Sequence, residues 1–253
     1  MLVLWLIVVL GTITATIVVR TRETSALAGN ARARVVGKYA AESGVSLATA
    51  ELERSLEAFA DTAGRQRYLN HLDAALTHRG DVQLGDASFS VVLVDVSARL
   101  DVNTADEPAL TRFFSLFDPS AAAATAAAIR RAIDAQPVTV ARGSQSNSGG
   151  SELVAARLFR SLDELEHLPG VSVTLLRAAA PYLTVDGDGK INRATASDTV
   201  LVAAAGSLQD EPSRLLVVSR GWLRGHSLTH EIQAVYAIAG NQLKLVRWRE
   251  RDL

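Results

Sequence analysis

Four acidic residues lie close together in the sequence, around the end of one predicted strand: Asp95, Asp101, Asp106 and Glu107. Two carboxylates held side by side can act as a general acid and a general base. Asp also caps helices, and acidic residues are common in a first helical turn. We favour the cap and turn interpretation, because no nucleophile, phosphate-binding or dinucleotide-binding motif accompanies these residues. The sequence therefore predicts no catalytic residue and no enzyme.

The segment DGDGKI at residues 186–191 begins like a calcium-binding loop. A complete loop has another oxygen ligand at its fifth position and a bidentate glutamate at its twelfth. Lys190 and Ser197 occupy those two positions. We therefore interpret the segment as a β-turn, with calcium as the weaker alternative. We expect no cofactor, no cofactor-binding residue and no metal ligand.

Two histidines, His226 and His230, are four residues apart, and Glu231 follows directly. On a helix this spacing could supply two ligands of one metal ion. The region is instead predicted as a loop that enters a strand, and it has no HExxH motif. We therefore expect both histidines to be surface residues.

Two segments resemble the helix-hairpin-helix of DNA-binding modules, LPGV at 168–171 and FDPS at 117–120. Such modules place backbone N–H groups of a glycine-rich hairpin, and a nearby Lys or Arg, on phosphates. Here Gly170 is the one glycine of the two hairpins, and three acidic residues lie at 163–166. We expect a packing or protein-contact role and no nucleic acid. A membrane-tethered or exported DNA-binding receptor is the alternative function.

A long helix is predicted over residues 21–59, because apolar residues recur every three or four positions on one stripe. The stripe consists of Ala41, Val45, Ala48, Leu52, Leu56 and Phe59. Further helices are predicted at residues 64–77, 106–117, 120–135, 161–168, 174–180 and 197–206. Strands are predicted at residues 88–95, 182–185, 190–192, 214–222, 231–239 and 243–249, and residues 99–102 form a partner or the end of the first.

The order of these elements predicts an α+β fold with an antiparallel sheet and a large all-helical insertion of the helix-hairpin-helix or SAM-like kind. Gly240-Asn241 is expected to join the last two strands as a tight hairpin. The stretches 100–110 and 191–201 resemble each other, each being a strand end followed by a capped helix. We therefore expect the chain to leave the sheet and to return to it through two similar junctions. Residues 142–151, rich in Ser and Gly, are expected to form a flexible loop.

Residues 2–19 carry no charge and include only one glycine and three threonines as less apolar residues. At about 1.5 Å per residue such a helix reaches about 27 Å, close to the thickness of the bilayer hydrocarbon. The run can be a signal anchor, the apolar half of a longer helix, or a signal peptide cleaved before Gly29. The third interpretation is the weakest, because the run is overlong and lacks a basic start.

The bulk composition excludes several classes of function. The formal net charge is −1, so the whole chain has no strong attraction for nucleic acid or for anionic lipid. The chain contains no cysteine, which excludes thiol, haem-thiolate and zinc-finger chemistry.

Several motifs together resemble the type II secretion minor pseudopilin K family, also called general secretion pathway protein K (GspK). The motifs are LWL at 4–6, AAESGV at 40–45, LDVNTA at 100–105, SLDELEHLPGV at 161–171, APYLTV at 180–185 and VRWRE at 246–250. Each motif is weak alone, but their order spans nearly the whole chain.

The resemblance implies a pilin-like domain with a helical insertion, at the tip of a periplasmic pseudopilus and bound to the minor pseudopilins I and J. It implies a single-pass protein of the bacterial inner membrane with most of the chain in the periplasm, supporting protein secretion across the outer membrane. The family lacks the glutamate that other pseudopilins carry near their start, and here no acidic residue precedes Glu23.

Two features depart from the family. The sequence does not open with the basic residues and glycine of a prepilin leader. Residues 136–151 are rich in Ser and Gly where the family often has an acidic and aromatic stretch, so the calcium sites of some family members are less expected here. The expected division of the chain is a transmembrane part at 1–20, a first pilin-like part at 21–102, a helical insertion at 103–183 and a second pilin-like part at 184–253.

Overall fold

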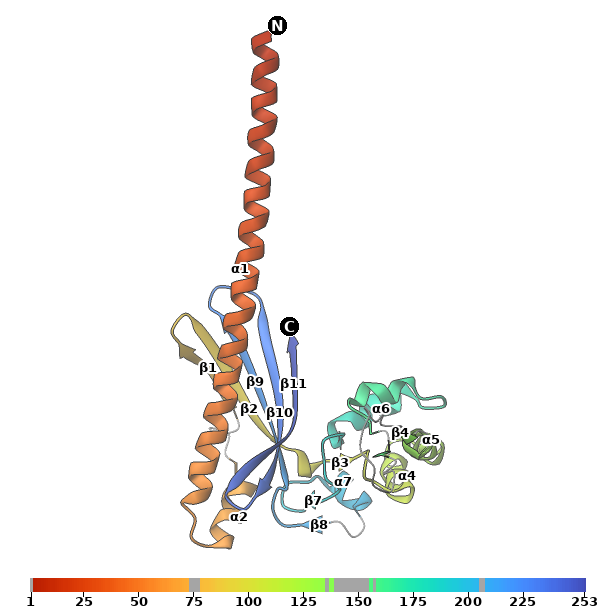
Figure 1. Ribbon diagram of the computed structural model, residues 1–253. Helices are drawn as coiled ribbons and strands as arrows, with labels where there is room; N and C mark the ends of the chain where they lie inside the picture. Colours follow the sequence, from red (N-terminus) through yellow and green to blue (C-terminus); the bar gives the residue numbers. More distant parts are fainter. Residues whose placement is uncertain (1, 73–77, 135–136, 139–154, 157, 205–207) are drawn as a thin grey trace, which may run out of the picture.

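The computed structural model describes residues 2–72, 78–134, 137–138, 155–156, 158–204 and 208–253. One helix, α1 (Leu2–Glu57), runs along the sheet and continues far beyond it, so that the N-terminus is remote from the rest of the molecule (Figure 1). This confirms the long N-terminal helix expected from the sequence. Among the described residues, no helix is both long and apolar enough to cross a membrane.

The sheet has five antiparallel strands in the order β1-β2-β9-β10-β11. Its strands are β1 (His78–Leu84), β2 (Ala87–Asp95), β9 (Arg214–Leu223), β10 (Thr229–Ala239) and β11 (Gln242–Asp252). β2 and β9 are neighbours in the sheet although more than 100 residues separate them in the chain. The helical part is therefore an insertion between two adjacent strands, as predicted, but it is not all-helical, because short two-residue strands also pair within it.

The insertion and its flanks contain helices α4 (Glu107–Ser115), α5 (Ala122–Asp134), α6 (Val173–Ala179) and α7 (Asp198–Ala203), and 3₁₀ segments η2 (Leu162–His167) and η3 (Ala180–Tyr182). Two-residue strands pair as β3 (Leu100–Asp101) with β6 (Leu183–Thr184), β4 (Pro137–Val138) with β5 (Ala155–Ala156), and β7 (Ile191–Asn192) with β8 (Leu208–Gln209). The remaining elements are α2 (Thr62–Asn70) and η1 (Val96–Ala98).

The apolar stripe of α1 packs on one face of the sheet. Ala41 and Val45 are buried against Phe89, Val91 and other residues of the three central strands. Further along, Leu52 and Leu56 form a second cluster with Leu69 and Leu215. The predicted stripe thus faces the protein's own sheet, except that α1 ends at Glu57 and Phe59 stacks on Tyr68 instead.

The close approach of α1 to the sheet depends on two glycines. Gly221 in β9 lies against the backbone of α1, where an added Cβ would collide with the carbonyl oxygen of Gly37 and the amide of Ala41. Gly44 in α1 lies against Phe89 and Ser219, and has no room for a Cβ either. Because glycine lacks a side chain, helix and sheet backbones can lie closer here than other residues would allow.

The helical part has a core of its own, which includes Phe113 and Phe114 of α4, Ile129 of α5 and Leu176 of α6. It also includes residues beyond position 183, among them Val200 of α7. α4 begins where Asp106 Oδ1 accepts a 2.7 Å hydrogen bond from the amide of Ala109, with Pro108 in the first turn. A side-chain cap and a proline in the first turn are typical of a helix start.

Several predictions of local structure were wrong or incomplete. The stretch at 99–102 is neither a partner nor the end of β2, because its strand β3 pairs with β6 instead. β1 was not predicted, because its sequence HRGDVQL lacks apolar alternation and its strand pairs with β2 through a bulge. The segment predicted as a helix at 161–168 is the 3₁₀ segment η2. The helix predicted at 64–77 ends at Asn70, while the expected loop at 142–151 lies outside the described residues.

Candidate functional site

The candidate site is the junction where the chain leaves the sheet for the helical part and returns. β3 on the way out pairs in parallel with β6 on the way back, with Leu100 opposite Leu183 and Asp101 opposite Thr184. The amide of Val102 extends this pairing by donating to the Thr184 carbonyl at 2.9 Å. Two segments far apart in the sequence are therefore joined at the neck of the insertion.

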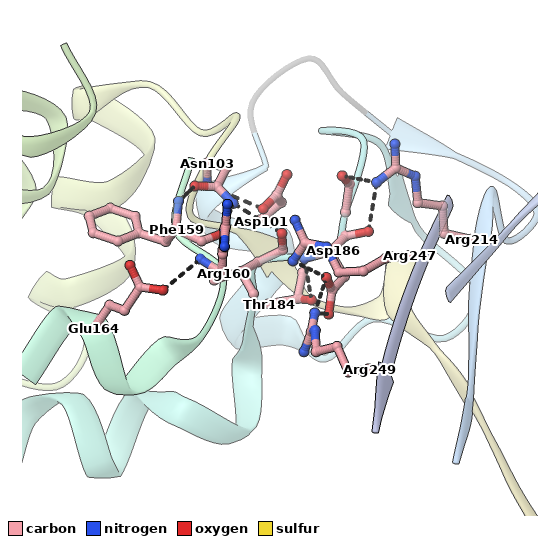
Figure 2. Close-up of polar contacts among 12 residues, drawn as sticks. Asp101, Asn103, Phe159, Arg160, Glu164, Thr184, Asp186, Arg214, Arg247 and Arg249 are labelled. Atoms are coloured by element: carbon pink, nitrogen blue, oxygen red, sulfur yellow. Dashed lines mark hydrogen bonds and ion pairs between the residues drawn. The ribbon is translucent and has the colours of Figure 1, made fainter. Parts of the chain in front are cut away.

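Asn103 connects three segments at this neck (Figure 2). Its Nδ2 donates to the carbonyl oxygens of Phe159 and Val185, both at 3.0 Å, and its Oδ1 accepts from the Phe159 amide at 2.7 Å. The side chain is buried, so an unpaired amide would cost free energy. Asparagine is suited to this place because its amide group both donates and accepts.

Asp186 connects the neck to the last strand of the sheet. Its carboxylate accepts hydrogen bonds from Arg247, at 2.7 Å, and from Arg249, both on β11 (Figure 2). Arg214 on β9 donates to the backbone carbonyl of Asp186 at 2.7 Å. Three arginines from two strands thus hold one loop of the insertion against the sheet, through charge-assisted contacts that are stronger than neutral ones.

A second carboxylate, Asp101, is buried nearby with only 3% of its surface exposed. Burial raises the pKa of Asp101. Hydrogen bonds from the Thr104 hydroxyl and from the backbone N–H of Asn103 oppose that rise. Its neighbour Gly187 leaves space for it, since an added Cβ there would lie within 3 Å of the Asp101 Cβ. Asp101 therefore shapes the neck by accepting hydrogen bonds from its own turn.

The calcium-like segment is part of this junction. Asp186 is already paired with two guanidinium groups, whose positive charges oppose a cation at the same oxygens. Asp188 accepts from the amide of Lys190 at 3.2 Å, a local turn contact, and Gly189 has a φ of 82°. Within the described ranges, no group of three or more His, Asp or Glu side chains is placed to hold a metal ion.

The remaining acidic candidates also have structural contacts, some of which join Asp95 to residues far away in the sequence. Asp95 accepts from the amide of Ser97 at 2.8 Å and from the side chains of Asn192 and Thr195 at 2.9 and 2.6 Å. Asp106 caps α4, and Glu107 lies in the first turn of that helix. The structure gives these four acids the cap and turn roles expected from the sequence.

The expectation that both histidines lie at the surface was wrong for His230, whose side chain is only 11% exposed. It lies near Gly37 of α1. Its Nδ1 lies 2.8 Å from an Asp252 carboxylate oxygen and its Nε2 lies 3.4 Å from Glu250, both on the neighbouring strand β11. His226 is half-buried in the turn before β10. His230 is covered because alternate residues of a strand share a face. Ile232 and Ala234, on the same face of β10 as His230, pack against the helix.

The hairpin at 168–171 joins η2 to α6, and Gly170 has the left-handed φ of 85° that such a turn requires. Its flanking acids serve the local structure: Glu164 accepts from the amide of Arg160 at 3.0 Å (Figure 2). Ser161 accepts from the amide of Asp163 at 3.1 Å. These contacts fit a packing role for the segment.

Residue-level reasoning missed the main connectors, Asn103, Arg214, Arg247 and Arg249. The sequence does contain a pattern that could have indicated them. Arginine recurs at positions 247, 249 and 251, and alternate residues of a strand share a face. A row of three arginines on one face needs a carboxylate partner, and Asp186 stood in a loop without a complete ligand set.

A long N-terminal helix laid along an antiparallel sheet, with an inserted helical part, defines a pseudopilin-like fold. The chain is similar to a chain in the crystal structure of the GspK-GspI-GspJ complex from the enterotoxigenic Escherichia coli type 2 secretion system. The TM-score is 0.62 and the identity 13%, and the match covers 92% of this chain and 99% of the other. At this identity the likeness concerns the fold. No protein-family model and no curated protein matches the sequence.

Proposed function

We propose that this protein is a minor pseudopilin of a type II secretion system, related to GspK, which caps the tip of a periplasmic pseudopilus. The observation that carries this proposal is the likeness in fold over nearly the full length of both chains. The partners would be the minor pseudopilins I and J of the same system. The protein would act by assembly and would have no catalytic role.

The apolar run at residues 2–19 supports an anchor in the inner membrane, with the bulk of the chain in the periplasm. In this mechanism the bilayer holds the first part of α1 before assembly. Contacts with neighbouring helices replace the lipid when the subunit enters the fibre. Gly11 and the threonines of the run would permit close approach of those helices.

The helical part supports a position at the end of the fibre. It projects beside the sheet and widens the molecule on the side away from the long exposed stretch of α1 (Figure 1). A wide subunit suits the end of a filament, because it leaves less room for a further subunit above it. The contacts of Asn103 and Asp186 would keep the inserted part in a fixed orientation while the fibre is pushed outward.

The proposal is tested by expressing the full chain in membranes with the minor pseudopilins I and J of its own organism. The extracted species is then weighed by native mass spectrometry in detergent. A complex with one copy of each chain is expected. The proposal is wrong if this chain stays monomeric while I and J still bind each other in the same sample.

The DNA-binding alternative makes a different prediction for the same preparation. It requires binding to a labelled DNA duplex that weakens steeply with salt, because released counterions drive such binding. We expect no such binding, since the hairpin at 168–171 has acidic residues beside it. Salt-sensitive binding to the duplex, without assembly with I and J, would favour the receptor function instead.

A further inference from the structure

The outer edge of β11 is open. β11 is the last strand of the sheet and pairs with β10 on one side only, from Ala239 opposite Gln242 to His230 opposite Asp252. No other strand of the described chain pairs with its second side. A free strand edge presents a row of backbone N–H and C=O groups to which another strand can add.

This edge strand also exposes large apolar side chains. Leu245 is 55% exposed, Val246 46% and Trp248 37%. Natural edge strands usually avoid such side chains, because they promote unwanted pairing. Their presence on an eleven-residue strand suits a surface that is covered by a partner.

The two faces of β11 differ in charge. Arg247, Arg249 and Arg251 lie opposite Val235, Gln233 and Glu231 of β10, on the face turned away from α1. Glu250 and Asp252 lie on the other face, toward α1. There Lys38 and Arg34 of the helix neutralise them at 2.9 and 3.0 Å.

The positive face keeps an excess of charge. Asp186 is shared by Arg247 and Arg249, and Glu231 is shared by Arg220 and Arg251. Four guanidinium groups therefore face two carboxylates. Lys244 lies on the same face, opposite Ala237, and has no ion pair among the described residues. The face is complementary to a partner with negative charges.

Self-association at this edge is opposed by the same charges. Two antiparallel copies of β11 related by a two-fold axis would place identical faces together, with arginine opposite arginine. Like charges directly opposite each other destabilise a strand pair. A nucleic acid would not use the backbone hydrogen-bonding groups of the free edge, because it has no strand to add to the sheet.

We propose that the outer edge of β11 is a docking site for an extended acidic segment of a protein partner, which adds to the sheet as an antiparallel strand. Backbone hydrogen bonds would supply binding, as in other cases of strand addition. Asp or Glu at every second position of the segment would lie over the arginine face. This surface does not depend on which secretion subunit the protein is.

The test uses the full chain in detergent and a fluorescent eleven-residue peptide of alternating Glu and Val. Two control peptides have the same length: one carries Lys in place of Glu, and one is N-methylated at every residue. Binding is measured by fluorescence anisotropy, and hydrogen exchange is followed at β11. We expect the Glu peptide alone to bind and to slow exchange of the β11 amides.

A matched pair of charge reversals locates the site. Lys244→Glu should weaken binding about two- to fivefold, as expected for one exposed ion pair. Arg177→Glu makes the same change in net charge at an exposed position on α6, outside the sheet, and should leave the affinity unchanged. The proposal would be overturned if the Lys peptide or the N-methylated peptide bound as well as the Glu peptide. It would also be overturned if both substitutions had equal effects, or if duplex DNA displaced the Glu peptide.

Discussion

At the scale of single residues, the junction depends on a few polar side chains whose partners come from distant parts of the chain. Asn103 uses three hydrogen bonds to connect segments around positions 103, 159 and 185. Asp186 brings two arginines of β11 to the neck of the insertion. Because these groups lie in largely buried surroundings, each lost partner leaves a polar group without its hydrogen bonds.

We expect Asp186→Asn to lower the free energy of unfolding by about 2 kcal/mol, as for the loss of hydrogen bonds between charged groups. Asn keeps the shape but removes the negative charge between Arg247 and Arg249. Urea denaturation measures the change. The matched control is Asp134→Asn, which removes one exposed ion pair to Arg130 and should cost less than about 0.5 kcal/mol. Equal losses for both variants would contradict the argument.

Asp101 makes stability depend on pH. Burial raises the pKa of its carboxyl above the ordinary value of 3.8, so the folded state holds this proton more tightly than the unfolded state. Its contribution to stability is therefore full below pH 3.8 and is lost as the pH rises through the folded pKa. Asp101→Asn cannot lose a proton, so its stability relative to the natural protein should increase from acid toward neutral pH. Urea titrations at several pH values test the sign, and a constant difference would refute it.

At the scale of elements, the contact between α1 and the sheet depends on backbones that nearly touch. We expect Gly221→Ala to cost about 2 kcal/mol or more, because the new methyl group would collide with the backbone of α1. The control is Gly80→Ala in β1, where an added Cβ meets open space. That variant should be close to neutral in thermal unfolding. If Gly221→Ala were equally neutral, helix and sheet would not be in close contact there.

At the scale of the whole molecule, the proposed membrane anchor can be separated from the rest of the helix. We expect Leu10→Arg to reduce the membrane-bound fraction of the full chain, since an arginine near the centre of a spanning helix costs about 3 kcal/mol. Leu27→Arg makes the same change on α1 outside the uncharged run, where the side chain is 68% exposed, and should have no effect. Sedimentation with membranes measures both. If neither variant, or both variants, had a reduced membrane-bound fraction, the result would argue against an anchor at residues 2–19.

The sequence determined the features that depend on neighbouring residues. The long helix, the stripe from Ala41 to Leu56, the capped start of α4 and the hairpin at Gly240 all follow from local periodicity, caps and turn residues. The order of the elements also predicted a sheet interrupted by a helical part. The helix, the stripe, the cap and the hairpin were predictable because each is set by contacts within a few positions along the chain.

The tertiary structure decided the features that join distant residues. β1 is a strand because β2 lies beside it, and its own residues carry little strand signal. His230 is covered because its strand faces α1, and Asp186 is an anchor for arginines because β11 passes the neck of the insertion. The open edge of β11 exists only once the order of the strands is known. Such pairings depend on the path of the whole chain, which local sequence patterns do not encode.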